Sequence, residues 1–299
     1  MTELKLSKNT KSKCNSAIVI SGAYRSGTTM IGQIIHSMKN VEYIFEPALF
    51  RSLFPLIEKM PAKQWQLLYE TYLCNDFLYD ALSGRRLNCN KKDYTLIYNT
   101  KSKKLVSQRY SKMWTKKELG GIARKSHVAY KLPSIVPFIP KLQNYYPKTR
   151  VIIIQRNPND IFHSLKEKGW FIDEAMETAD SIFPGFFPYH QYKNYTVPLF
   201  VKNKDIKLFA QLDELHRMAY YYIRMYENLR KIKNAIIIQY ENFLKNPKEE
   251  TFKLSKKLNL KYGEKTKDII STIELRRKNR KENLLRLVNK EVRKKLEKL

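Results

Sequence analysis

Short apolar, β-branched runs alternate with amphipathic segments along most of the chain. The runs that predict strands cover residues 17–21, 41–46, 127–131, 150–155 and 234–240. Helical spacing of apolar positions follows the first run and predicts a helix there, and further helices are expected within 134–146, 157–168, 212–232 and 248–258. Strands that alternate with helices predict an α/β fold with a parallel, doubly wound sheet and right-handed crossovers.

Four stretches depart from this alternation and define the predicted organisation. Residues 1–15 are polar and basic, which predicts a disordered lead-in to a single domain over 16–273. Residues 60–125 and 170–211 show no clear period, and we interpret them as insertions above the sheet edge, where a binding pocket would be built. Residues 274–299 predict a basic amphipathic helix, which either packs on the domain, the favoured reading, or contacts an anionic membrane surface.

The charge balance is strongly basic, with 57 Lys and Arg against 28 Asp and Glu and a net charge of +29. Such a balance indicates anionic partners, which could be nucleic acid, a membrane surface or phosphorylated and sulfated small molecules. Nucleic-acid binding is disfavoured because the chain contains no recognisable nucleic-acid module. Three cysteines without metal-ligand spacing, a polar N-terminus and the absence of a long apolar run favour a cytoplasmic protein without a membrane span.

The segment SGAYRSGTTMIG, which follows the first predicted strand, resembles a phosphate-binding loop of the form GxxxxGK[ST]. Gly22 and Gly27 have the required spacing, and Thr29 occupies the final position, but Thr28 stands where the lysine is expected. The N–H groups from Ser26 to Thr29, at the start of a helix, would form a cradle for an anion. The sequence therefore predicts a phosphate site that differs from that of a nucleotide triphosphatase.

A P-loop kinase of nucleotides or small molecules is the main alternative. It requires the loop lysine and an acidic residue that helps to hold magnesium at the end of a later strand. The strand over 150–155 is followed by Arg156, and the strand over 234–240 is followed by Glu241. Neither strand ends in the Asp that such a kinase uses to hold magnesium. These departures disfavour the kinase.

Further polar residues are expected beside this loop. Glu46, Lys131 and Arg156 each stand at the end of a predicted strand, and parallel strands bring their carboxyl ends to one edge. Ser164 follows Arg156 by eight residues on the next helix. A planar guanidinium and a hydroxyl are both suited to binding a phosphate.

These residues carry a resemblance to the sulfotransferase family, which uses 3′-phosphoadenosine 5′-phosphosulfate (PAPS). The segments YRSGTT and RNPNDIFHS resemble the two motifs with which that family binds the nucleotide. The segment VEYIFEPALF resembles Golgi carbohydrate sulfotransferases. The segment YKLPSIVPFIPKLQNYYPKTRVIIIQRNP resembles tyrosylprotein sulfotransferases. A strand–helix element found across the family is similar to IIIQYENFLKNP. The resemblance spans about residues 16–260 and leaves both insertions unmatched.

The resemblance implies a P-loop-like domain that transfers a sulfuryl group to an acceptor hydroxyl or amine, releases adenosine 3′,5′-bisphosphate and needs no metal. The residues implied in holding the 5′-phosphosulfate are Gly22, Arg25, Ser26, Gly27, Thr28 and Thr29. Arg156 and Ser164 match the pair that binds the 3′-phosphate.

The resemblance also implies catalytic roles. Arg25 and Lys131 would flank the bridging oxygen, and Glu46 would act as the general base. The alternative for Glu46 is a structural salt bridge with an arginine at the sheet edge. The Glu-Pro strand favours a glycan or glycolipid acceptor, whereas the Lys-x-Pro segment favours a tyrosyl or peptide acceptor, so both classes, and small phenols, remain open.

Overall fold

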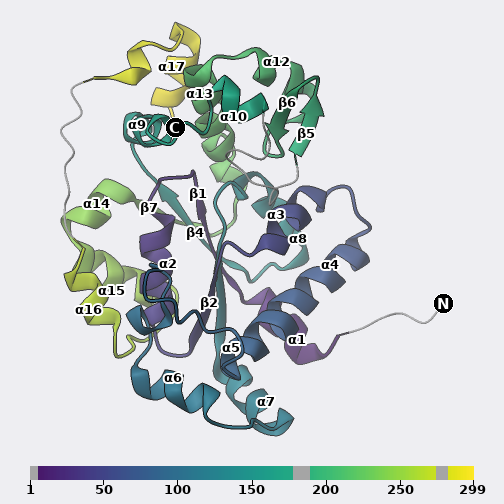
Figure 1. Cartoon of the computed structure of the whole chain (residues 1–299), viewed down its shortest axis with the longest axis vertical. Coiled ribbons are helices and arrows are strands. Elements are labelled where there is room, and N and C mark those ends of the chain that lie inside the picture. Colours follow the sequence, from purple (N-terminus) through teal and green to yellow (C-terminus); the bar gives the residue numbers. More distant parts are fainter. Residues whose placement is uncertain (1–5, 178–188, 274–281) are drawn as a thin grey trace.

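Within the residues that the computed structural model describes (6–177, 189–273 and 282–299), a parallel sheet occupies the centre of the molecule (Figure 1). Its strand order is β2-β3-β1-β4-β7. The strands are β1 (Ile18–Gly22), β2 (Val41–Phe45), β3 (His127–Lys131), β4 (Arg150–Gln155) and β7 (Ile236–Gln239). This arrangement confirms the predicted P-loop-like α/β fold.

Helices cover both faces of the sheet and create two apolar layers (Figure 1). One layer is formed by α2 (Thr28–Ser37), α14 (Tyr240–Lys245), α15 (Pro247–Lys257) and α16 (Thr266–Ser271). The other is formed mainly by α1 (Lys8–Asn15), α3 (Ala48–Leu53), α4 (Ala62–Glu70), α8 (Ile139–Tyr145), α9 (Pro158–Lys166) and α13 (Glu214–Tyr226). Strands β1 and β4 are apolar on both sides because both of their faces are buried.

The two insertions differ in where they lie. The first contains a π-helix (Thr71–Tyr79), α5 (Asp80–Leu82), α6 (Lys103–Tyr110) and α7 (Lys116–Lys125). The second contains α10 (Asp173–Glu177), the hairpin of β5 (Tyr189–Tyr192) and β6 (Tyr195–Pro198), and α12 (Ile206–Gln211). The expected position above the carboxyl edge is wrong for α6 and α7, which lie at the amino ends of the strands (Figure 1). Helix α7 ends at Lys125, directly before the amino end of β3 at His127, and a buried ion pair joins Arg109 of α6 to Glu42 near the start of β2.

The prediction of a disordered lead-in over residues 1–15 is wrong from Lys8 onward. Helix α1 begins there, capped by the Ser7 hydroxyl, which accepts from the Thr10 N–H. It packs on the apolar layer through the fully buried Cys14. A short segment that is polar in composition folds here because the rest of the domain supplies an apolar surface.

The C-terminal segment also differs from the prediction of one helix over 274–299, part of which (274–281) lies outside the described residues. Residues 284–286 form a single 3₁₀ turn, and α17 spans Lys290–Glu297. Leu284, Val288 and Leu296 are buried in the layer that contains α9 and α13. Packing on the domain, one of the two alternatives, is therefore the arrangement of 282–299. Among the described residues, no helix is long and apolar enough to cross a bilayer.

Candidate active site

The loop between β1 and α2 depends on two glycines. Gly27 caps α2 with a φ of +98°, and Gly22 has a φ of +153°. A Cβ at Gly27 would lie 2.5 Å from Cδ2 of Tyr240, and one at Gly22 would lie 2.5 Å from the Ile154 oxygen. No side chain caps the helix and its first turn contains no acidic residue. The first N–H groups of α2, which the helix itself cannot satisfy, are thus suited to an anionic ligand.

Tyrosine hydroxyls of α13 hold the first half of this loop. Ala23 donates its N–H to Tyr226 Oη at 2.9 Å, and Tyr24 donates its N–H to Tyr221 Oη. Tyr226 in turn donates to the Ile154 carbonyl at 2.8 Å. Both tyrosines are buried in the apolar layer, and their contact with the loop was not predicted. Helical spacing predicts a buried face, and it does not identify what the hydroxyls bind.

Two arginines and a serine gather beside the loop. Arg25, with a positive φ of +65°, donates from Nε to Ser164 Oγ at 2.9 Å. Arg156 donates from Nη1 to the Arg25 carbonyl at 2.9 Å and stacks over Tyr240, with its guanidinium carbon 4.6 Å from the ring centroid. The buried Arg156 Nε has no partner among the described residues. Side chains from three segments therefore converge into a cationic cluster with an unused donor, which fits a phosphate.

A second polar cluster surrounds Glu46, which has a φ of +42°. One carboxylate oxygen pairs with Lys131 Nζ, and the other accepts from Arg51 Nη2 at 2.9 Å. Lys131 also donates to Thr29 Oγ1 at 3.1 Å and lies 4.2 Å from the ring centroid of Phe45. Burial lowers the pKa of Lys131, and the neighbouring Glu46 partly offsets this effect. A carboxylate and an ammonium group thus lie directly beside the anion-binding loop.

Two of the predicted catalytic residues, Lys131 and Glu46, pair with each other, and Arg25 donates to Ser164. Arg25 lies near enough to Lys131 for its charge to help lower the pKa of that lysine. The alternative that Glu46 pairs with an arginine is realised through Arg51. Arg51 was missed, although its place on the helix that directly follows Glu46 is a signal that could have identified it.

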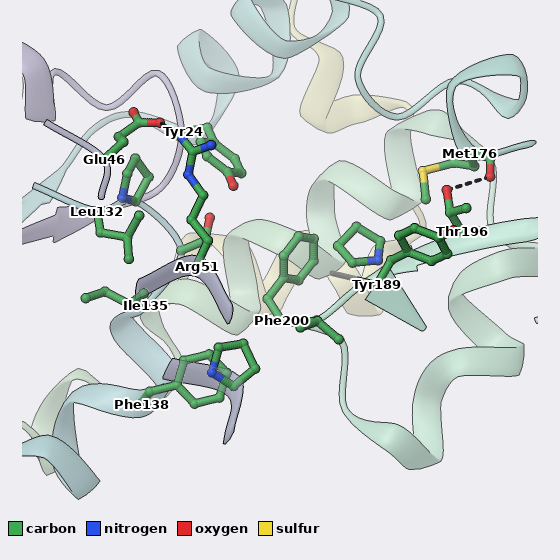
Figure 2. Close-up of a pocket in the computed structure, with 15 residues that line it drawn as sticks. Tyr24, Glu46, Arg51, Leu132, Ile135, Phe138, Met176, Tyr189, Thr196 and Phe200 are labelled. Carbon is green, nitrogen blue, oxygen red and sulfur yellow. Dashed lines mark hydrogen bonds and ion pairs between the residues drawn. The ribbon is translucent and has the colours of Figure 1, made fainter. Parts of the chain in front are cut away.

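A pocket opens beside Glu46 (Figure 2). Its lining comes from the loop, α3, the segment after β3 and the second insertion. The lining residues are Tyr24, Glu46, Arg51, Pro55, Leu132, Pro133, Ser134, Ile135, Phe138, Met176, Tyr189, Thr196, Pro198, Leu199 and Phe200. None of the described residues of the first insertion lines this pocket.

A second, more polar pocket lies against α2. Its lining comprises Thr29, Gln33, His36, Tyr43, Ile44, Phe45, Phe77, Arg85, Arg86, Leu87, Asn88, Tyr94, Thr95, Ile97 and Thr100. Lys131 bonds both to Glu46, which lines the first pocket, and to Thr29, which lines the second. Its ammonium group therefore lies where both pockets meet the loop.

A comparison with protein-family models agrees with this geometry. A model described as "Sulfotransferase family" matches residues 17–264. The chain belongs to the sulfotransferase family. Membership indicates a transferase, and it confirms the resemblance carried by the sequence motifs. A search of curated proteins found no match.

Solved sulfotransferase structures are among those to which the chain is similar. One is the sulfotransferase STF1 from Mycobacterium tuberculosis H37Rv, at 13% identity and a TM-score of 0.43, with 95% of this chain and 76% of that chain covered. Another is the sulfotransferase STF9 from Mycobacterium avium, at 13% identity and a TM-score of 0.39, with 86% of this chain and 67% of that chain covered. Identities this low carry no information about the ligands of this chain, and the family assignment depends on the family model.

Proposed function

We propose that the protein transfers the sulfuryl group of PAPS to an acceptor hydroxyl in the pocket beside Glu46. The observation that carries the proposal is the convergence of Arg25, Arg156 and Ser164 beside the glycine loop. A donor with two phosphates on one nucleoside needs two separate anion sites. The first turn of α2 would hold the 5′-phosphosulfate, and the cluster of Arg25, Arg156 and Ser164 would hold the 3′-phosphate.

The residues of the Glu46 cluster have distinct roles in this proposal. PAPS supplies the sulfuryl group, whose sulfur gains a bond to the acceptor oxygen as its bond to the 5′-phosphate oxygen breaks. Glu46 accepts the proton of the acceptor hydroxyl on a lone pair that its contacts with Lys131 and Arg51 leave free. Lys131 and the first N–H groups of α2 stabilise the negative charge that develops on the departing phosphate oxygen.

Thermal stability with added nucleotide tests the donor assignment. Adenosine 3′,5′-bisphosphate, the expected product, should raise the melting temperature in the absence of added metal ions, because a ligand that binds the folded state stabilises it. ATP with magnesium should have little effect. Stabilisation by ATP with magnesium but not by the bisphosphate would instead support the P-loop kinase.

Arg156→Ala examines the 3′-phosphate site directly. Removing a charge-assisted contact should weaken bisphosphate binding by at least about tenfold. Arg230→Ala removes the same charge from an exposed position after α13 and should leave affinity unchanged. Equal affinities of the two variants would contradict the assignment. If the basic charge instead served nucleic-acid binding, the two variants should have equal bisphosphate affinities, and the affinity for nucleic acid should fall steeply with salt.

A further inference from the structure

The pocket beside Glu46 is apolar over most of its length and carries charge at one end. Glu46 and Arg51 lie at that end, and aromatic and aliphatic side chains extend away from them toward the β5–β6 hairpin (Figure 2). The aromatic and aliphatic lining residues are Tyr24, Leu132, Ile135, Phe138, Met176, Tyr189, Leu199 and Phe200. The surface therefore offers apolar contact to most of a bound molecule.

Two hydroxyls of this lining are already bonded to the protein. The Ser134 hydroxyl bonds Tyr221 Oη at 2.9 Å, and the Thr196 hydroxyl donates to the Met176 carbonyl at 2.9 Å. Backbone N–H groups of the lining are also occupied, since Leu132, Ser134 and Phe138 donate to backbone carbonyls within the protein. Three further lining residues, Pro55, Pro133 and Pro198, have no N–H. A sugar ring buried here would lose its bonds to water without replacement, at a cost in affinity on the order of tenfold for each unpaired hydroxyl.

We infer that the acceptor is an alcohol or phenol whose hydroxyl lies at the end of an apolar body. The inference rests on the proposed function, since it assigns the pocket to the acceptor. The reactive hydroxyl lies at the polar end, beside Glu46 and Arg51, and the apolar body fills the remainder of the pocket. A free glycan does not match this surface. A sugar that carries a lipid or aromatic group can still present a hydroxyl at the polar end, while the apolar group occupies the pocket.

Binding of two homologous series tests the inference. The probes are 1-alkanols from butanol to octanol and the corresponding alkyl glucosides below their micelle concentrations, titrated calorimetrically into the protein saturated with adenosine 3′,5′-bisphosphate. Burial of each added methylene should raise affinity about fourfold until the pocket is full. Glucose and maltose should bind more weakly than hexanol. Affinity that is independent of chain length, or sugars that bind more tightly than hexanol, would overturn the inference.

Two variants connect the chain-length effect to this pocket. Leu199→Ser and Phe138→Ser each replace a half-buried apolar side chain of the lining and should reduce the increment per methylene. Leu208→Ser and Phe252→Ser make the same changes at exposed positions outside the lining and should retain it. If the control variants lose the chain-length effect equally, the probes bind elsewhere and the inference fails.

The same titrations separate this inference from the proposed function. Chain-length dependence in a protein that does not bind the bisphosphate would refute the PAPS assignment, while the apolar ligand class would stand. Bisphosphate binding with no chain-length dependence would refute the apolar ligand class, while the PAPS assignment would stand. Transfer of labelled sulfate from PAPS to the two series then shows whether the reactive hydroxyl belongs to the apolar body itself or to an attached sugar.

Discussion

Replacement of Gly27 by alanine examines how the loop, Tyr240 and the candidate 3′-phosphate site depend on one another. Gly27 has a φ of +98°, and an added Cβ would lie 2.5 Å from Cδ2 of Tyr240. The same ring supports the Arg156 guanidinium at 4.6 Å. The substitution must therefore displace either the loop or the ring, and displacement of the ring removes the support of Arg156.

The expected loss of stability has two parts. A left-handed backbone costs an L-residue about 1–2 kcal/mol, and overpacking costs about 1–3 kcal/mol. Their sum is about 2–5 kcal/mol, which for a chain of this length lowers the melting temperature by roughly 4–10 °C. Affinity for adenosine 3′,5′-bisphosphate should fall about tenfold or more, because contacts with both phosphates are disturbed.

Calorimetric titration and thermal unfolding measure both effects, with Gly120→Ala as the control. Gly120 lies in α7, where an added Cβ would meet no atom closer than 3.9 Å, so alanine should leave affinity unchanged and stability equal or higher. Adding Tyr240→Ala to Gly27→Ala should relieve the overpacking but not the backbone strain. A Gly27→Ala protein with unchanged melting temperature and bisphosphate affinity would refute the reasoning.

Three further predictions concern separate parts of the molecule. Glu46→Gln should retain bisphosphate affinity while the rate of sulfuryl transfer from labelled PAPS falls about 10²- to 10⁴-fold, and an unchanged rate would exclude Glu46 as the base. Glu42→Ala leaves the buried Arg109 guanidinium without its carboxylate, and urea unfolding should show a loss of about 3–5 kcal/mol. Little or no loss would mean that water reaches Arg109. Burial, and secondarily Arg150, lower the pKa of His127 from 6.5 to about 4, so the unfolded state binds the proton more readily. The free energy of unfolding should therefore fall as the pH is lowered from about 6.5 toward 4, and His127→Gln should reduce that fall in pH-dependent denaturation.

The strands and the loop were predictable from sequence because their signals are local. The apolar run over 150–155 needs burial on both faces, and β4 spans Arg150–Gln155 as expected. The glycine spacing of the loop likewise identified a turn between β1 and α2. Parallel strand ends share one edge, so the proximity of Glu46, Lys131 and the loop also followed from sequence.

Contacts between distant segments were not predictable in the same way. The bond from Arg25 to Ser164 on α9 joins residues 139 positions apart and was not predicted. A buried ion pair likewise joins Arg109 of α6 to Glu42 near the start of β2, 67 residues apart in the chain. Such contacts result from the packing of whole elements and leave no periodic signal in the sequence.

The sequence alone determined the α/β alternation, the phosphate loop without its lysine, the spacing of Arg156 and Ser164, and the family resemblance. These features depend on residue type and short-range spacing, since helix and strand periods and turn geometry operate over a few residues. Only the tertiary structure decided that Arg51 shares Glu46 with Lys131, that tyrosines of α13 hold the loop, and that the pocket beside Glu46 is apolar. Each of these results requires side chains from several elements to meet in space, and packing of the complete domain determines which of them do.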